Sequence, residues 1–191
     1  MAERLHCPRE WSDMAGLLDV LIRAIRARRV LEIGTGTGAS GLEIAAALPP
    51  DGRLITIERD AAAAMEARAA FADAGCEHRV SVMIGDAARY LHKIAGPFEL
   101  ILQDGDPSQY DTLHERLVTL VAPGGLLVTR NLTASGDYNK LLAGDARLIT
   151  AFLESAKGLA LSVKRLDLAA RGESPGEHRE RRGAPQARRD D

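Results

Sequence analysis

The 191-residue sequence has only two cysteines, Cys7 and Cys76, and few aromatic residues. Two cysteines cannot form a disulfide framework or a cysteine zinc site. No apolar run approaches the roughly 20 residues that a transmembrane helix needs. The N-terminus carries charges and a proline where a signal peptide has its apolar stretch. With a formal net charge of only -2, the composition predicts a cytoplasmic protein that binds neither membranes nor nucleic acids.

The composition is that of one soluble globular domain with a charged end. Hydrophobic residues make up 46% and charged residues 27% of the chain. From about residue 170 onward the charges are mixed and the apolar periodicity disappears. We therefore predict a folded domain over residues 1–169 and a disordered charged tail over residues 170–191.

Short apolar runs alternate with helical patterns along most of the chain. The runs that predict strands cover residues 29–33, 53–58, 79–84, 98–103 and 125–129. Continuous runs of this kind are typical of parallel strands covered on both faces. The helical patterns cover residues 14–26, 61–74, with Asp60 as the expected N-cap, and 109–121. The alternation predicts right-handed crossovers and a doubly wound sheet.

The last part of the domain breaks this alternation. Residues 148–154 and 159–166 both have strand patterns, and only a few residues separate them. Two strands joined so closely pair as an antiparallel hairpin. The predicted fold is therefore α/β and Rossmann-like: a doubly wound, mostly parallel seven-stranded sheet closed by a C-terminal antiparallel β-hairpin.

A glycine-rich loop, EIGTGTG at 32–38, lies between the first predicted strand and the next helix. Glycines allow a tight turn and close approach of a ligand, and the helix start supplies unpaired N–H groups. The spacing of Gly34, Gly36 and Ala39 also satisfies the dinucleotide fingerprint. Glu58, at the end of the second predicted strand, could hold the ribose hydroxyls of a dinucleotide or of S-adenosylmethionine. The loop by itself leaves these two cofactors open, and a tight turn without a ligand is the third alternative.

Five motifs, taken together, resemble class I S-adenosylmethionine-dependent methyltransferases, in particular the O-methyltransferase family that contains catechol and caffeoyl-coenzyme A methyltransferases. The first is VLEIGTGTGASGLEIAAALPPDGRLITIERD, whose Glu32 has no place in the dinucleotide fingerprint. The later motifs follow in the family's order: GDA at 85–87, LQDGD at 102–106, PGG at 123–125 and GLALSVKR at 158–165. The resemblance covers roughly residues 8–166, and it implies methylation of a small-molecule hydroxyl with S-adenosylmethionine as cofactor.

The resemblance also implies which residues hold the cofactor. The glycine loop and Ser40 would border its methionine part, and Glu58 would bind both ribose hydroxyls. Asp86 and Ala87 would lie near the adenine, whereas Trp11 would either project toward the pocket or pack at the helix entrance. The expected cofactor-binding residues are Trp11, Glu32, Gly34, Thr35, Gly36, Gly38, Ser40, Glu58, Gly85, Asp86, Ala87 and Asp104.

The acceptor side of the sequence departs from the family pattern. Many members hold a divalent metal through an aspartate after the fourth strand and an Asp-Asn pair after the fifth. Asp104 and Asn131 match the first and last ligands, but the middle position is Arg130, which has five donors and no acceptor. The family's lysine falls on Pro107. We expect no tightly bound metal; Asp104 and Asn131 are its ligands only if a metal binds after all.

Three residues are the catalytic candidates: Asp104, Asp106 and Arg130. Arg130 is expected to stand in place of the cation and to pair with Asp104 or an anionic acceptor, with a solvent-facing side chain as the alternative. A desolvated Asp104 or Asp106 could have a raised pKa and act as general base.

Two polar residues outside these motifs are expected to have ordinary roles. His114 is expected to be a solvated residue on an exposed helix. Tyr138, in the polar stretch 132–147, is expected to be an ordinary loop residue, with substrate contact as the alternative.

Two other classes of function stay open. A nicotinamide-dependent oxidoreductase shares the glycine loop and Glu58, but it does not explain Glu32 or the closing hairpin. A catalytically impaired protein that only binds S-adenosylmethionine would explain Arg130 and Pro107. In the preferred interpretation the partner is a small-molecule acceptor, and the resemblance adds a homodimer, because relatives are frequently dimers.

Overall fold

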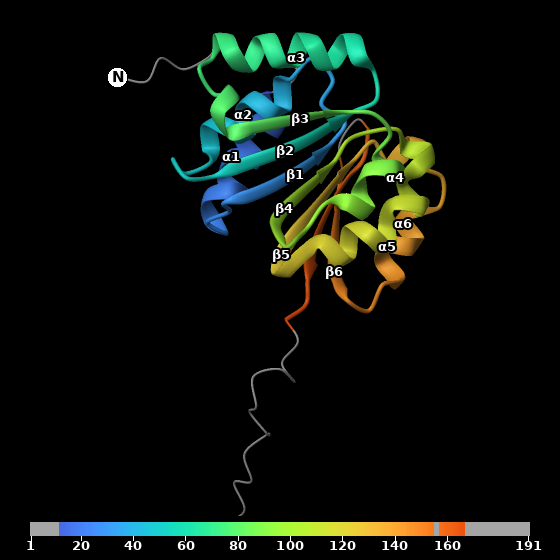
Figure 1. Cartoon of the computed structure of the whole chain (residues 1–191). Coiled ribbons are helices and arrows are strands. Elements are labelled where there is room, and N and C mark those ends of the chain that lie inside the picture. The colour runs from blue at the N-terminus through green and yellow to red at the C-terminus, as the bar shows by residue number, and fades with distance from the viewer. Residues whose placement is uncertain (1–11, 155–156, 167–191) are drawn as a thin grey trace, which may run out of the picture.

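The computed structural model describes residues 12–154 and 157–166. In this part of the chain the strands form one seven-stranded sheet with helices on both faces (Figure 1). The strands are β1 (Arg29–Ile33), β2 (Arg53–Glu58), β3 (Val80–Ile84), β4 (Phe98–Gln103), β5 (Val121–Arg130), β6 (Leu148–Leu153) and β7 (Leu159–Lys164). The helices are α1 (Ser12–Ala24), α2 (Ala39–Ala47), α3 (Ala61–Asp73), α4 (Ala87–Tyr90), α5 (Tyr110–Leu120) and α6 (Tyr138–Gly144), with short 3-10 turns between them.

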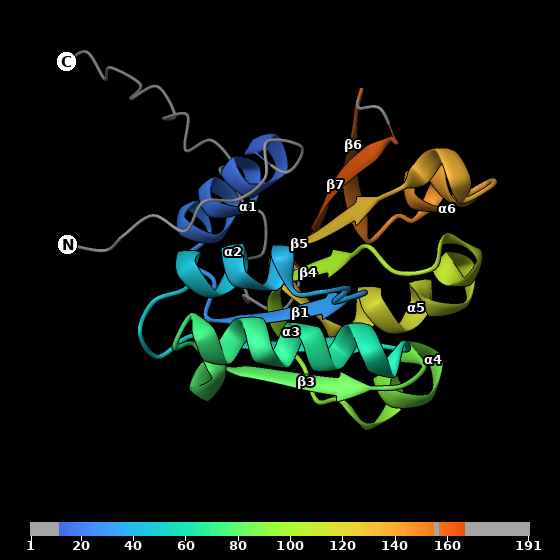
Figure 2. The same ribbon diagram turned by 90° about the horizontal axis from the view of Figure 1, so that it is seen from above.

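The strand order is β3-β2-β1-β4-β5-β7-β6. Strands β1 to β5 pair in parallel, and β7 is antiparallel to both β5 and β6. Figure 2 shows β3 and the β6–β7 hairpin at opposite ends of the sheet. The predicted doubly wound sheet and its closing hairpin are confirmed.

The sheet is buried on both faces, which explains the continuous apolar runs in its strands. In β1, Val30 packs with α1 and α2 on one face, whereas Leu31 and Ile33 pack with α4, α5 and α6 on the other. Both cores consist mainly of aliphatic side chains. A strand covered on both faces needs an apolar side chain at nearly every position.

Most predicted element bounds are within two residues of the observed ones, and Asp60 caps α3 by accepting hydrogen bonds from the N–H groups of Ala62 and Ala63. The polar stretch 132–147, which was expected to be a loop, instead contains a 3-10 turn and the helix α6. The fifth strand begins at Val121, four residues before the predicted start. Trp11 and the predicted tail lie outside the described residues, as does the predicted domain boundary at residue 169.

The direction of the crossovers decides where a ligand can bind. The chain runs outward from β1 to β2 and β3, and then returns to the other side of β1 to form β4 and β5. Crossovers that diverge in this way leave a crevice at the carboxyl ends of the strands, between β1 and β4. None of the helices in residues 12–154 and 157–166 is long and apolar enough to cross a membrane.

Candidate active site

A cavity of about 540 Å³ opens at the carboxyl ends of the parallel strands β1 to β4. The segments that follow these four strands supply most of its wall. The lining residues that the sequence predicted as cofactor-binding are Gly34, Thr35, Gly36, Ser40, Glu58, Gly85, Asp86, Ala87 and Asp104. The cavity therefore lies in the crevice that the topology predicts, and the sequence motifs meet there.

The glycine loop after β1 has a shape that L-residues with side chains adopt poorly. Gly34 has a φ of 91°, and a Cβ at this position would lie 2.7 Å from the carbonyl oxygen of Asp104. Gly36 has a φ of 51°, but a Cβ there would meet no atom within 4 Å. Gly34 thus allows the loop to pass close to the end of β4, whereas Gly36 leaves open space at the cavity.

Glu58 ends β2 and points into the loop. One carboxylate oxygen accepts a hydrogen bond from the N–H of Gly36 at 2.8 Å, and the other accepts from the N–H of Asp60 at 2.9 Å. Each oxygen of a carboxylate can accept a further hydrogen bond. Glu58 is therefore held in place with acceptor capacity left for two neighbouring hydroxyl groups, as the predicted ribose contact needs.

Glu32 was expected among the cofactor-binding residues, but the structure places it beneath the loop. It is fully buried and accepts hydrogen bonds from the hydroxyls of Ser40 at 2.5 Å and Thr56 at 2.6 Å. Burial raises the pKa of Glu32 to about 7, although the two hydroxyls oppose that rise. Gly38 is also absent from the cavity wall; it precedes α2 and packs against Ala67 of α3. Neither residue lines the cavity, and both hold the loop against the elements beneath it.

Polar side chains line the side of the cavity formed by the segments after β3 and β4. Asp86 accepts a hydrogen bond from the N–H of Ala88 at 2.8 Å and another from the side-chain amide of Gln109 at 3.1 Å. Asp106 forms an ion pair with Arg59 at 2.7 Å. Hydrogen bonds from Ser108 and then Arg59 hold the pKa of Asp106 below its usual range. The raised pKa expected at Asp106 is therefore wrong, because a hydrogen-bonded, ion-paired carboxylate at the surface favours its charged form.

Asp104 lies where the ends of β4 and β5 meet. One of its oxygens accepts a hydrogen bond from the guanidinium of Arg130, and the other accepts from the side-chain amide of Asn131 at 2.7 Å. The side chains of Arg130 and Asp104 are only 18% and 9% exposed, so the predicted pairing is present and Arg130 does not point to solvent. Burial raises the pKa of Asp104, and the positive charge of Arg130 opposes this rise.

These residues do not fit a divalent metal ion. The Asn131 amide turns its NH₂ group, not its oxygen, toward the carboxylate, so Asp104 alone presents acceptor oxygens here. Arg130 adds a fixed positive charge and no acceptor atom. In the described part of the chain, no group of three or more His, Cys, Asp or Glu residues could hold a metal ion.

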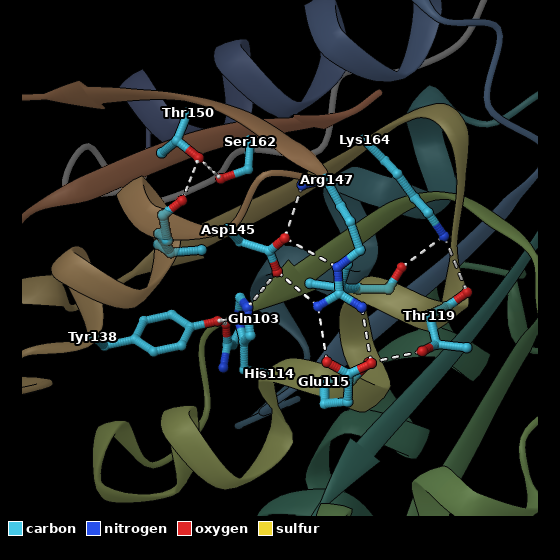
Figure 3. Close-up of polar contacts among 12 residues, drawn as sticks. Gln103, His114, Glu115, Thr119, Tyr138, Asp145, Arg147, Thr150, Ser162 and Lys164 are labelled. Atoms are coloured by element: carbon cyan, nitrogen blue, oxygen red, sulfur yellow. Dashed lines mark hydrogen bonds and ion pairs between the residues drawn. The ribbon is translucent and has the colours of Figure 1, made fainter. Parts of the chain in front are cut away.

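Two expectations about polar residues are wrong. His114 is 4% exposed, and its ring lies between the hydroxyl of Tyr138, at 3.0 Å, and the carboxylate of Asp145, at 2.9 Å. Tyr138 is fully buried, and its hydroxyl donates to the side-chain oxygen of Gln103 at 3.1 Å (Figure 3). His114 shares a face of α5 with the buried residues Tyr110, Leu113, Leu117 and Val118. Its place in that apolar stripe was the signal in the sequence that could have shown its burial.

Sequence comparison places the chain in a class that agrees with this geometry. The model of the family described as O-methyltransferase matches residues 8–161, so the chain belongs to this family. Catechol O-methyltransferase domain-containing protein 1 of Mus musculus is 30% identical over an alignment of 173 residues, gaps included, that covers 80% of this chain and 66% of the relative. The caffeoyl-CoA O-methyltransferase of Stellaria longipes is 27% identical over 176 residues, covering 78% of this chain and 73% of the relative.

Solved structures show the same fold. The O-methyltransferase TomG from Streptomyces achromogenes, in complex with SAM, matches with a TM-score of 0.75 and 28% identity over 80% of each chain. Cofactor-bound Rv0187 from MTB matches with a TM-score of 0.78 and 27% identity, over 86% of this chain and 84% of that one. The predicted family and its cofactor, S-adenosylmethionine, are thereby confirmed.

Proposed function

We propose that this protein transfers a methyl group from S-adenosylmethionine to the hydroxyl of a small molecule, without a tightly bound metal ion. The observation that carries the proposal is the cavity at the ends of β1 to β4, whose lining includes both Glu58 and Asp104, and Asp104 is paired with Arg130. The proposal combines membership of the family with contacts between residues that lie far apart in the sequence.

The residues of the cavity fit the cofactor. Glu58 would accept hydrogen bonds from the ribose hydroxyls, and the open side of Gly36 would leave room for the ligand next to the loop. Asp86 and Ala87 would lie beside the adenine. When bound, S-adenosylmethionine supplies the electrophilic methyl group. The protein contributes mainly by holding the acceptor oxygen in line with that methyl group, because alignment of the reacting atoms gives most of the rate acceleration.

We assign Asp104 as the general base that accepts the proton of the acceptor hydroxyl. It lines the cavity, and burial raises its pKa. A carboxylate with a raised pKa is a better general base at neutral pH than an ordinary one. Arg130, bonded to the same carboxylate, would stabilise the negative charge that develops on the acceptor oxygen. Asp106 is not assigned this role, because hydrogen bonds from Ser108 and then Arg59 lower its pKa.

Calorimetry on the full chain tests the cofactor and the absence of a metal. We expect S-adenosylmethionine and S-adenosylhomocysteine to bind equally well with magnesium and with a chelator, and we expect no binding of NAD. Transfer of a radiolabelled methyl group to a panel of phenols, catechols and hydroxy acids then tests the reaction. Binding of NAD alone would favour the oxidoreductase that the comparisons do not support. Loss of activity with the chelator would refute the metal-free part.

Cofactor binding without turnover on any acceptor would favour the catalytically impaired interpretation. The homodimer and the cytoplasmic location stay predictions. Sedimentation equilibrium of the full chain, whose mass is 20.5 kDa, tests whether the protein is a homodimer.

A further inference from the structure

The hydroxyl of Tyr110 lies between the ends of two neighbouring strands. Tyr110 begins α5 and is 1% exposed. Its hydroxyl donates a hydrogen bond to the carbonyl oxygen of Arg130 at 2.9 Å. The carbonyl oxygens of Gln103 and Gly105 lie 3.5 Å from the same hydroxyl. These two carbonyls flank Asp104 in the chain, so one hydroxyl contacts the backbone on both sides of the Asp104–Arg130 pair.

The sheet itself does not hold the two strand ends together at this level. The parallel pairing of β4 with β5 ends at Gln103 and Thr129, one residue before Asp104 and Arg130. Arg130 still pairs with Leu159 of β7, on the side away from β4. The N–H of Asp104 still bonds to the carbonyl of Ile33 in β1 at 2.9 Å, on the side away from β5. Beyond the last β4–β5 pair, side chains join the two strand ends: Arg130 and Asn131 donate to Asp104, and the Tyr110 hydroxyl contacts the backbone of both ends.

The ring of Tyr110 is itself held by a buried polar network. The ring of Tyr138 packs edge-on against it, with centroids 5.4 Å apart and planes at 63°. The Tyr138 hydroxyl bonds to the side chains of Gln103 and His114, and His114 in turn contacts Asp145 (Figure 3). Aromatic rings in edge-on contact and fixed by hydrogen bonds have little freedom to turn.

We propose that Tyr110 is a positioning residue for methyl transfer: its hydroxyl sets the separation of Asp104 and Arg130 by joining the ends of β4 and β5. Tyr110 does not line the cavity, so it acts through these two residues and not on the acceptor. This inference rests on the proposed function. A small displacement of groups that align a reaction can cost up to about 100-fold in rate.

Tyr110→Phe tests the proposal, because it keeps the ring and removes only the hydroxyl. Ser162→Ala is the matched control: Ser162 is also fully buried, and its hydroxyl bonds to Thr150 at 2.9 Å within the β6–β7 hairpin. The first readout needs no acceptor. Because the Asn131 amide contacts the Tyr110 hydroxyl directly, NMR of the full chain follows the Nε–H of Arg130, whose guanidinium donates to Asp104. We expect its signal to shift and its exchange with water to become about tenfold faster in Tyr110→Phe, and neither to change in Ser162→Ala.

The second readout is kinetic, at a temperature where both variants are folded. We expect kcat to fall about tenfold in Tyr110→Phe with little change in KM, and S-adenosylhomocysteine to bind within about threefold of the unaltered protein. Ser162→Ala should keep its kcat. An unchanged Arg130 Nε–H signal in Tyr110→Phe, or an equal loss of kcat in Ser162→Ala, would overturn the proposal. Lack of turnover by the unaltered protein would contradict the proposed function, while the Arg130 signal would still decide the role of Tyr110.

Discussion

At the scale of single residues, Arg130 sets the charge next to Asp104, the proposed general base. Its guanidinium is bonded to that carboxylate, at a position where the sequence resemblance implies a metal ligand. Both side chains are mostly buried, so neither charge is well solvated. A buried ion pair of this kind adds little net stability, but removal of one partner leaves the other charge uncompensated.

Replacement of Arg130 by Met should therefore damage both activity and stability. Arg130→Met keeps the length of the side chain and removes its charge. We expect kcat to fall about 100-fold, because a charge-stabilising donor is lost, and the free energy of unfolding to fall by about 3 kcal/mol. Enzyme assays and urea denaturation measure the two effects. Arg28→Met is the control, since the Arg28–Asp51 pair is exposed and lies away from the cavity; it should change stability by less than about 1 kcal/mol.

At the scale of elements, the glycine loop joins β1 to α2 and forms part of the cavity wall. Two of its N–H groups are bonded within the protein: Gly34 donates to the carbonyl of Ile57 at 2.9 Å, and Gly36 donates to Glu58. Beneath it, Glu32 ties the start of α2 to β2 through Ser40 and Thr56. The loop therefore depends on contacts from three neighbouring elements.

Two alanine substitutions in this loop should have separable effects. In Gly34→Ala the new Cβ would lie 2.7 Å from the backbone of Asp104, so we expect loss of at least about 2 kcal/mol of stability without any ligand. In Gly36→Ala the new Cβ meets no protein atom, and only the positive φ costs about 1 kcal/mol. Because that Cβ would occupy ligand space, S-adenosylhomocysteine should bind at least about tenfold more weakly to Gly36→Ala. Thermal unfolding and calorimetry separate the two outcomes, and equal unfolding temperatures would contradict the steric argument for Gly34.

At the scale of the whole molecule, Glu32 links the stability of the fold to pH. Burial raises its pKa in the folded protein from 4.5 to about 7. An acid with a raised folded-state pKa favours folding while it is protonated, so its contribution is complete below pH 4.5 and is lost as the pH rises through 7. The full effect of such a shift is about 3 kcal/mol.

Glu32→Gln should remove this part of the pH dependence. Glutamine retains an oxygen for the hydroxyl of Ser40 or Thr56 but does not ionise. We expect the unaltered protein to lose stability relative to Glu32→Gln between pH 5 and pH 8, measured as the difference in the free energy of unfolding by urea. If the free energy of unfolding depends on pH in the same way in both proteins over this range, Glu32 is not the group responsible. The test therefore needs measurements at several pH values.

Much of this architecture could be predicted from local patterns. The apolar runs predicted seven strands, and the short separation of the last two predicted the hairpin that β6 and β7 form. The run that became β5 was predicted too short, because its first residues include the Pro-Gly-Gly segment at 123–125. The helix α6 was missed altogether, because it has only seven residues and begins in a polar stretch.

The sequence by itself determined the alternation of strands and helices, the glycine loop and the acid at the end of β2, because propensity, periodicity and turn chemistry depend on neighbouring residues. Only the tertiary structure decided that Glu32 lies under the loop, that Arg130 bonds to Asp104, and that Tyr110 joins two strand ends. The partners in these contacts are up to 26 residues apart in the chain. Their burial and direction follow from the packing of the sheet and helices, which no local pattern contains.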